Sequence, residues 1–98
     1  MNPARTPQFY MANLGSEIVG IYSAIARGDG GGKTVCYARA KKIINDFRQL
    51  EKRQSALAEV GKIEEIVEDL MSDVKKFAIP KADIENYFLP FATRLMSV

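Results

Sequence analysis

The chain has 98 residues and a mass of 10.9 kDa, which suffices for one domain and excludes a multidomain enzyme. Hydrophobic residues make up 47% and charged residues 27%, with a net charge of +2, as in ordinary globular chains. Histidine is absent and Cys36 is the single cysteine, which excludes the commonest general base, the commonest metal ligand and an internal disulfide. We expect no catalytic residue, no cofactor and no metal site.

The sequence also bears on the cellular compartment. No apolar run approaches the roughly 18–20 residues that span a bilayer, and residues 1–9 lack the apolar middle of a secretory signal. A single unpaired cysteine suits a reducing compartment. We therefore predict a soluble, cytoplasmic protein that does not contact a membrane.

The first predicted helix begins at Thr6-Pro7 and ends at Gly28. Threonine can accept an N–H bond from the first turn, proline at the first helical position loses no hydrogen bond, and glycine is the usual C-terminal stop. Glycine inside a helix costs roughly 1 kcal/mol relative to alanine. Gly15 and Gly20 therefore predict that another helix crosses this one closely. The apolar stripe that supports this helix comprises Leu14, Ile18, Ile21, Tyr22 and Ile25.

Four glycines in residues 28–32 predict a flexible connector without regular structure. A second helix is expected over about residues 34–53, where an apolar stripe recurs at helical spacing and includes Cys36 as a small hydrophobic residue. Its flanks are basic. Lys41, Arg48 and Lys52 fall within about 40° of one another on the helix, and they are the candidate contacts to a polyanion such as nucleic acid.

The third predicted helix covers about residues 56–77, with Ser55 as its N-cap. Its apolar residues repeat at spacings of three and four and are Val60, Ile63, Val67, Leu70, Val74 and Phe77. Its other faces are acidic. Residues 1–54 carry nine Lys/Arg and four Asp/Glu, whereas residues 55–98 carry five and eight. The basic second helix can thus bind a polyanion or pair with the acidic third helix, and the sequence leaves both alternatives open.

The fourth predicted helix covers about residues 81–96, and its apolar stripe stays in phase through Pro90, which predicts a kinked helix. Four segments of this length fold most simply as an all-α, antiparallel four-helix bundle with a glycine-rich first connector, in a single domain over residues 1–98. The aromatic cluster of the last helix exceeds what one small core needs, so it is also a candidate interface. The candidate interface residues are Tyr87, Phe88, Phe91 and Leu95.

Two landmarks, Met-Ala-Asn-Leu-Gly-Ser-Glu at residues 11–17 and Tyr-Phe-Leu-Pro-Phe-Ala at residues 87–92, resemble those of small uncharacterised prokaryotic all-helical proteins. Residues 38–44 are similar to the second helix of the same group. The resemblance covers about 20 of the 98 residues. It implies a helical fold and no known activity.

These observations predict a non-enzymatic interaction module that associates with itself through the C-terminal helix, most simply as a homodimer. The alternative is weak, non-sequence-specific nucleic-acid binding by the second helix, which would act through backbone phosphates.

Overall fold

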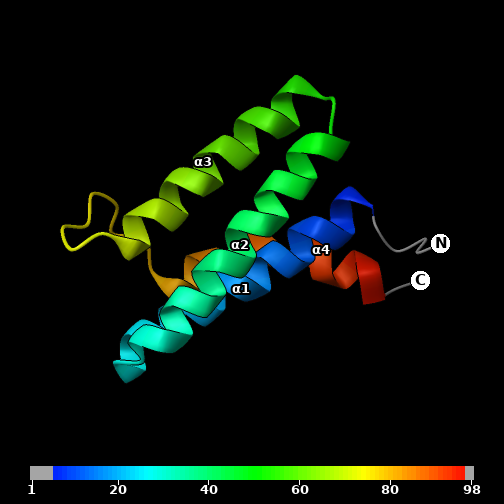
Figure 1. Cartoon of the computed structure of the whole chain (residues 1–98). Coiled ribbons are helices and arrows are strands. Elements are labelled where there is room, and N and C mark those ends of the chain that lie inside the picture. Colours follow the sequence, from blue (N-terminus) through cyan, green and yellow to red (C-terminus); the bar gives the residue numbers. More distant parts are fainter. Residues whose placement is uncertain (1–5, 97–98) are drawn as a thin grey trace.

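The computed structural model describes the backbone of residues 6–96 and the side chains of residues 6–93. The described part of the chain folds into four α-helices and no strand, which confirms the all-α class (Figure 1). The last helix has the predicted bounds and runs through Pro90 as one element. The helices are α1 (Pro7–Arg27), α2 (Gly30–Leu50), α3 (Gln54–Met71) and α4 (Lys81–Met96).

Both ends of α1 form as the sequence predicts. The Thr6 hydroxyl accepts a hydrogen bond from the Phe9 backbone N–H at 3.2 Å, and Pro7 occupies the first helical position. At the other end, Gly28 adopts the left-handed conformation with φ of 70°, which glycine reaches without steric cost. Local hydrogen bonding therefore fixes the length of α1.

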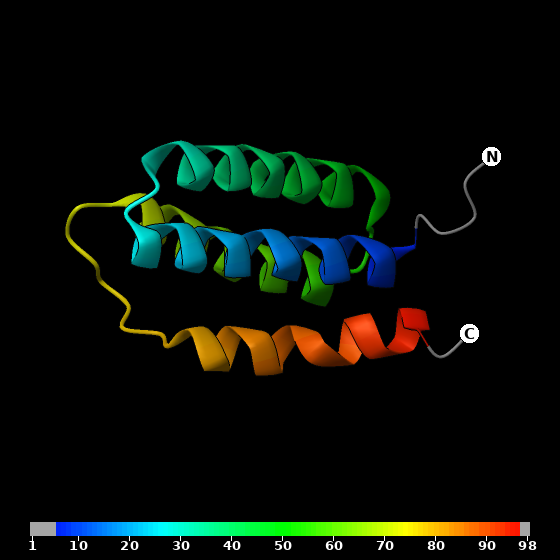
Figure 2. The ribbon, with the colours of Figure 1, turned by 90° about the horizontal axis from the view of Figure 1, so that it is seen from below.

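Helix α1 is the centre of the bundle. It packs against each of the other helices, and Figure 2 shows it lying between α2 and α4. Within the described residues, the backbone of α4 approaches that of α1 alone. Helix α3 covers part of α2 and α1, and its backbone stays apart from that of α4. The buried residues of α1 that form the middle of the core are Met11, Leu14, Ile18, Ile21 and Ala24.

Two glycines of α1 permit the close helix crossings, as the sequence predicts. A Cβ atom at Gly15 would lie 2.5 Å from Cγ and 2.6 Å from Cβ of Phe88, which sits on α4. A Cβ atom at Gly20 would lie 2.7 Å from the Sγ atom of Cys36, on α2. Real Cβ atoms do not approach other atoms so closely, so the missing side chains let α4 and α2 pack against α1.

The contact between Gly20 and Cys36 gives a testable coupling. Gly20→Ala should destabilise the protein by about 1 kcal/mol, because the new methyl group meets the sulfur atom. In a Cys36→Ala background the sulfur is gone and only the Cys36 Cβ remains, at 3.6 Å. There Gly20→Ala should be neutral or stabilising by up to about 1 kcal/mol, from helix propensity. Urea unfolding of the four proteins in this cycle measures the coupling, and an equal cost in both backgrounds contradicts it.

The prediction that residues 28–32 lack regular structure is wrong. Helix α2 begins at Gly30, not near residue 34, so only Gly28 and Asp29 connect it to α1. The Asp29 carboxylate accepts the Gly32 N–H at 2.8 Å and is itself held by Arg27 at 3.2 Å. This N-cap offsets the conformational entropy that the glycines lose on entering the helix.

The predicted bounds of the third helix are also wrong at both ends. Its N-cap is Arg53, without a side-chain cap bond, and Ser55 lies inside the helix. The helix ends at Met71 because the buried Asp69 carboxylate accepts the backbone N–H groups of Lys76 and Phe77 and draws the chain into a connector over residues 72–80. The predicted core residues Val74 and Phe77 therefore lie outside the helix and are exposed.

Candidate interaction surface

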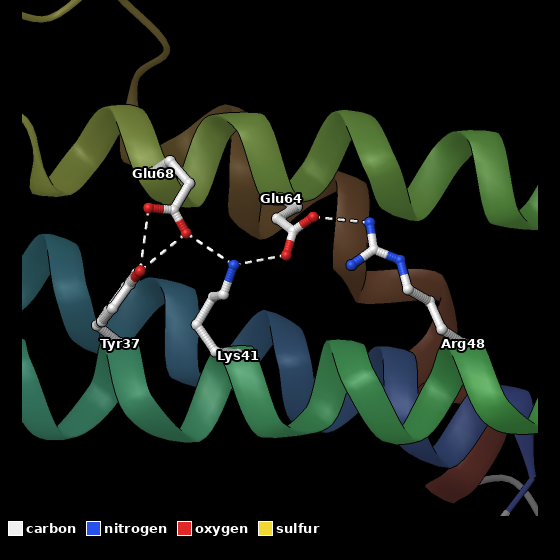
Figure 3. Close-up of polar contacts among 5 residues, drawn as sticks. All are labelled: Tyr37, Lys41, Arg48, Glu64 and Glu68. Carbon is white, nitrogen blue, oxygen red and sulfur yellow. Dashed lines mark hydrogen bonds and ion pairs between the residues drawn. The ribbon is translucent and has the colours of Figure 1, made fainter.

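A row of charged side chains joins α2 to α3 (Figure 3). The Lys41 ammonium lies 2.5 Å from one carboxylate oxygen of Glu64 and 2.8 Å from Glu68. Arg48 donates to the other Glu64 oxygen at 2.7 Å, and the Tyr37 hydroxyl contacts Glu68 at 2.9 Å. The sequence left open whether Lys41 and Arg48 bind a polyanion or pair with the acidic third helix, and in this structure they pair with that helix.

The row of charges shifts the titration of its members. Hydrogen bonds from Arg48 and Lys41 lower the pKa of Glu64 from 4.5 to about 2. The hydrogen bond from Lys41 likewise lowers the pKa of Glu68, while the hydrogen bonds to Glu64 and Glu68 raise the pKa of Lys41. The pKa shifts arise from the attraction between the charged side chains of α2 and α3, which stabilises the packing of these two helices.

The third candidate polyanion contact, Lys52, lies in the connector between α2 and α3 and is exposed. Its backbone N–H, together with that of Arg53, donates to the buried Glu51 carboxylate. The Arg53 guanidinium adds two further bonds to Glu51 and lowers the pKa of that carboxyl group to about 2. These contacts of Glu51, which sequence patterns did not indicate, hold the connector between α2 and α3.

The four candidate interface residues of α4 occupy different environments. Phe88 is 5% exposed and lies against Gly15, so it belongs to the core of the single chain. Phe91 is half-buried against that core. Tyr87 is 39% exposed, and its hydroxyl donates to the Glu59 carboxylate on α3. The side chain of Leu95 lies outside the described residues.

Helix α4 has two flanks that no helix backbone packs against, because its backbone approaches that of α1 only. Lys81, Glu85 and Leu89 recur every four residues and lie along one of them, which we call the outer flank. All three are exposed, with Leu89 at 59%. Neither Lys81 nor Glu85 forms an ion pair with another described residue. Asp83 and Tyr87 lie on the opposite flank, which faces α3.

Between α3 and α4 lies a half-enclosed apolar space of about 350 Å³, which we call the α3–α4 hollow. Ile18 of α1 forms its floor. A second, more polar space of about 330 Å³ lies toward the start of α1, and Glu59 lines both. The walls of the α3–α4 hollow are formed by Ile63 and Ile66 of α3, Ile79 of the connector, and Ile84 and Phe88 of α4, with Glu59, Lys62, Asp83 and Tyr87 as its polar lining residues.

The connector over residues 72–80 is held in place at the end of this hollow. The Tyr22 hydroxyl of α1 donates to the Ile79 carbonyl oxygen at 2.7 Å. Burial, and then the carboxylates of Asp69 and Asp83, raise the pKa of Tyr22. Two side chains of the bundle thus fix the connector, Asp69 at its start and Tyr22 at its end, and neither contact has a signature in the local sequence.

No group of three or more Cys, Asp and Glu side chains in the described residues could hold a metal ion. None of the described helices contains an apolar segment of the length that a membrane span requires. Comparison with known protein families, with curated proteins and with solved structures finds no match to this chain.

Proposed function

We propose that this chain is a non-enzymatic helical interaction module that forms a homodimer through the outer flank of α4. The proposal includes an antiparallel order of the four helices, supported by the short connectors on either side of α2, and a kink of α4 at Pro90. The observation that carries it is the one-sided packing of α4, which leaves Leu89 59% exposed on the outer flank, in the middle of the helix.

The charges of the outer flank favour a second copy of the chain as the partner. Lys81 and Glu85 have opposite charges and are one helical turn apart. In a twofold-symmetric dimer the two copies of α4 run in opposite directions, and if residue i of one copy faces residue j of the other, then j of the first also faces i of the second. Two residues of opposite charge on one copy can therefore pair with the same two residues on the other. Lys81 of each copy then faces Glu85 of the other, and Leu89, one turn beyond Glu85, lies past the start of the partner's α4, next to its connector.

The alternative, nucleic-acid binding through α2, has less support. Binding of phosphates requires free cationic groups, but Lys41 and Arg48 are engaged with Glu64 and Glu68. Lys52 is the one member of the three that enters no ion pair with another described residue. A phosphate backbone would have to displace two carboxylates to reach the other two, so we favour the interaction module.

An exchange of charges tests the dimer. Lys81→Glu should raise the dimer dissociation constant about fivefold, because it replaces attraction by repulsion at both symmetry-related contacts. The double variant with Lys81→Glu and Glu85→Lys should restore the original constant, since the exchanged pair is again complementary. Leu89→Glu should raise the constant at least tenfold by placing a charge where Leu89 packs against the partner's connector. Light scattering at several protein concentrations measures all three.

A matched control is Val35→Glu on α2, which also replaces an exposed apolar residue, at 48% exposure, but lies away from α4. It should leave the dissociation constant unchanged. A double charge exchange that weakens the dimer as much as the single change, or a Val35→Glu variant as weak as Leu89→Glu, would refute the proposed surface.

A further inference from the structure

The α3–α4 hollow is independent of the outer flank and has the composition of a ligand site. Its floor, Ile18, is fully buried, and five of its lining residues are isoleucines. Small-molecule sites are usually concave and apolar with a few polar groups, in volumes of about 300–1,000 Å³. The volume of about 350 Å³ lies in this range. The hollow is thus suited to bind through burial of apolar surface.

The hydrogen bond between Tyr87 and Glu59 limits what can enter. It joins α4 to α3 across the gap and separates the apolar hollow from the polar space that Glu59 also lines. A partner helix, with a diameter of about 10–12 Å including side chains, would have to break this bond to lie along the gap. A small molecule can enter with the bond intact. Because an apolar cavity of about 150 Å³ holds one benzene ring, this hollow has room for about two rings.

The charged lining residues of the hollow are two carboxylates, Glu59 and Asp83, and one ammonium, Lys62, while its walls are mostly isoleucines, against which a charged ligand would lose its hydration. Lys62 on the α3 side and Asp83 on the α4 side have opposite charges, and Glu59 already accepts the Tyr87 hydroxyl. A charged ligand would be attracted by one side and repelled by the other. We propose that the α3–α4 hollow is a binding site for an uncharged, apolar molecule of about two rings, held between the isoleucines of α3 and α4.

The isoleucine methyl groups are built-in reporters of this site. Five of the nine isoleucines line the hollow, and Ile21, Ile25, Ile43 and Ile44 do not. Titration of the methyl-labelled protein with naphthalene should give saturable NMR shifts at the five lining residues and none at the other four. The titration is repeated on the Leu89→Glu variant, in which the same result is expected because the outer flank lies elsewhere. Failure of the dimer and failure of this site are therefore separate results.

A substitution that fills the α3–α4 hollow provides the second test of the binding site. Ile66→Trp places a larger side chain in the α3 wall and should weaken naphthalene binding at least tenfold, while Val35→Trp, the matched change on α2, should leave it unchanged. If Ile66→Trp does not fold, the methyl shifts of the unmodified protein decide the question alone. The absence of saturable shifts up to the solubility limit of naphthalene would overturn the proposal. So would equal shifts at lining and non-lining isoleucines, or equal weakening by the two tryptophan variants.

Discussion

Replacement of Gly15 by alanine is expected to lower the free energy of unfolding by about 2–3 kcal/mol, the range of a severe overpacking substitution. The added methyl group would lie 2.5–2.6 Å from Cγ and Cβ of Phe88. The Phe88 Cβ cannot rotate away from its own backbone, so α4 must move off α1. Since the backbone of α4 approaches no other helix among the described residues, this displacement removes its main packing contact. Urea unfolding measures the change.

Gly61→Ala is the matched control for this substitution. Gly61 lies inside α3, and a Cβ atom there would meet nothing within 4 Å. The same chemical change should therefore stabilise the protein by about 0.5–1 kcal/mol, the ordinary difference in helix propensity. If the two alanine variants shift stability in the same direction by similar amounts, the close crossing of α1 and α4 is contradicted.

The second large effect concerns the acid stability of the contact between α2 and α3. The pKa of Glu64 is about 2 in the folded protein, against an ordinary value of 4.5. A carboxyl group with a lowered folded pKa contributes stability that is fully present above its unfolded pKa. That stability is lost as the pH falls from about 4.5 toward 2. Because the Glu64 side chain is 22% exposed, solvent screening limits this contribution to about 1–2 kcal/mol.

Glu64→Gln should remove this contribution at neutral pH and flatten the dependence of stability on pH between about 4.5 and 2. The control is Glu65→Gln, the neighbouring exposed carboxylate, which enters no ion pair with another described residue. Urea unfolding of both variants at a series of pH values measures the effect. Equal pH dependence in Glu64→Gln and the unmodified protein would show that Glu64 is not held by Lys41 and Arg48.

The parts of the fold that local chemistry determines could be predicted from the sequence. Thr6 caps α1 with its hydroxyl, Pro7 and Gly28 set its two ends through their backbone conformations, and Gly15 and Gly20 indicated close crossings. The C-terminal end of α3 depends instead on a side chain that reaches distant N–H groups. Asp69 stops α3 by binding Lys76 and Phe77, seven and eight residues further along the chain. A periodic apolar pattern that continues to Phe77 does not reveal this.

For the candidate sites, too, the sequence predicted the position of a residue on its helix but not the groups that it contacts in the fold. That Lys41 and Arg48 lie on one flank of α2 followed from helical spacing, but which partner they bind depends on the position of α3. Phe88 could be recognised as apolar, yet only its position against Gly15 shows that it is core. The α3–α4 hollow has no sequence signature, because its walls come from three helices and a connector.

The mass of the unmodified protein in solution tests the proposed function most directly. Light scattering coupled to size-exclusion chromatography, over a hundredfold range of protein concentration, should show a shift from 10.9 kDa toward twice that mass as the concentration rises. The Leu89→Glu variant should remain at 10.9 kDa over most of the same range. A mass of 10.9 kDa for the unmodified protein at every concentration would contradict self-association through α4.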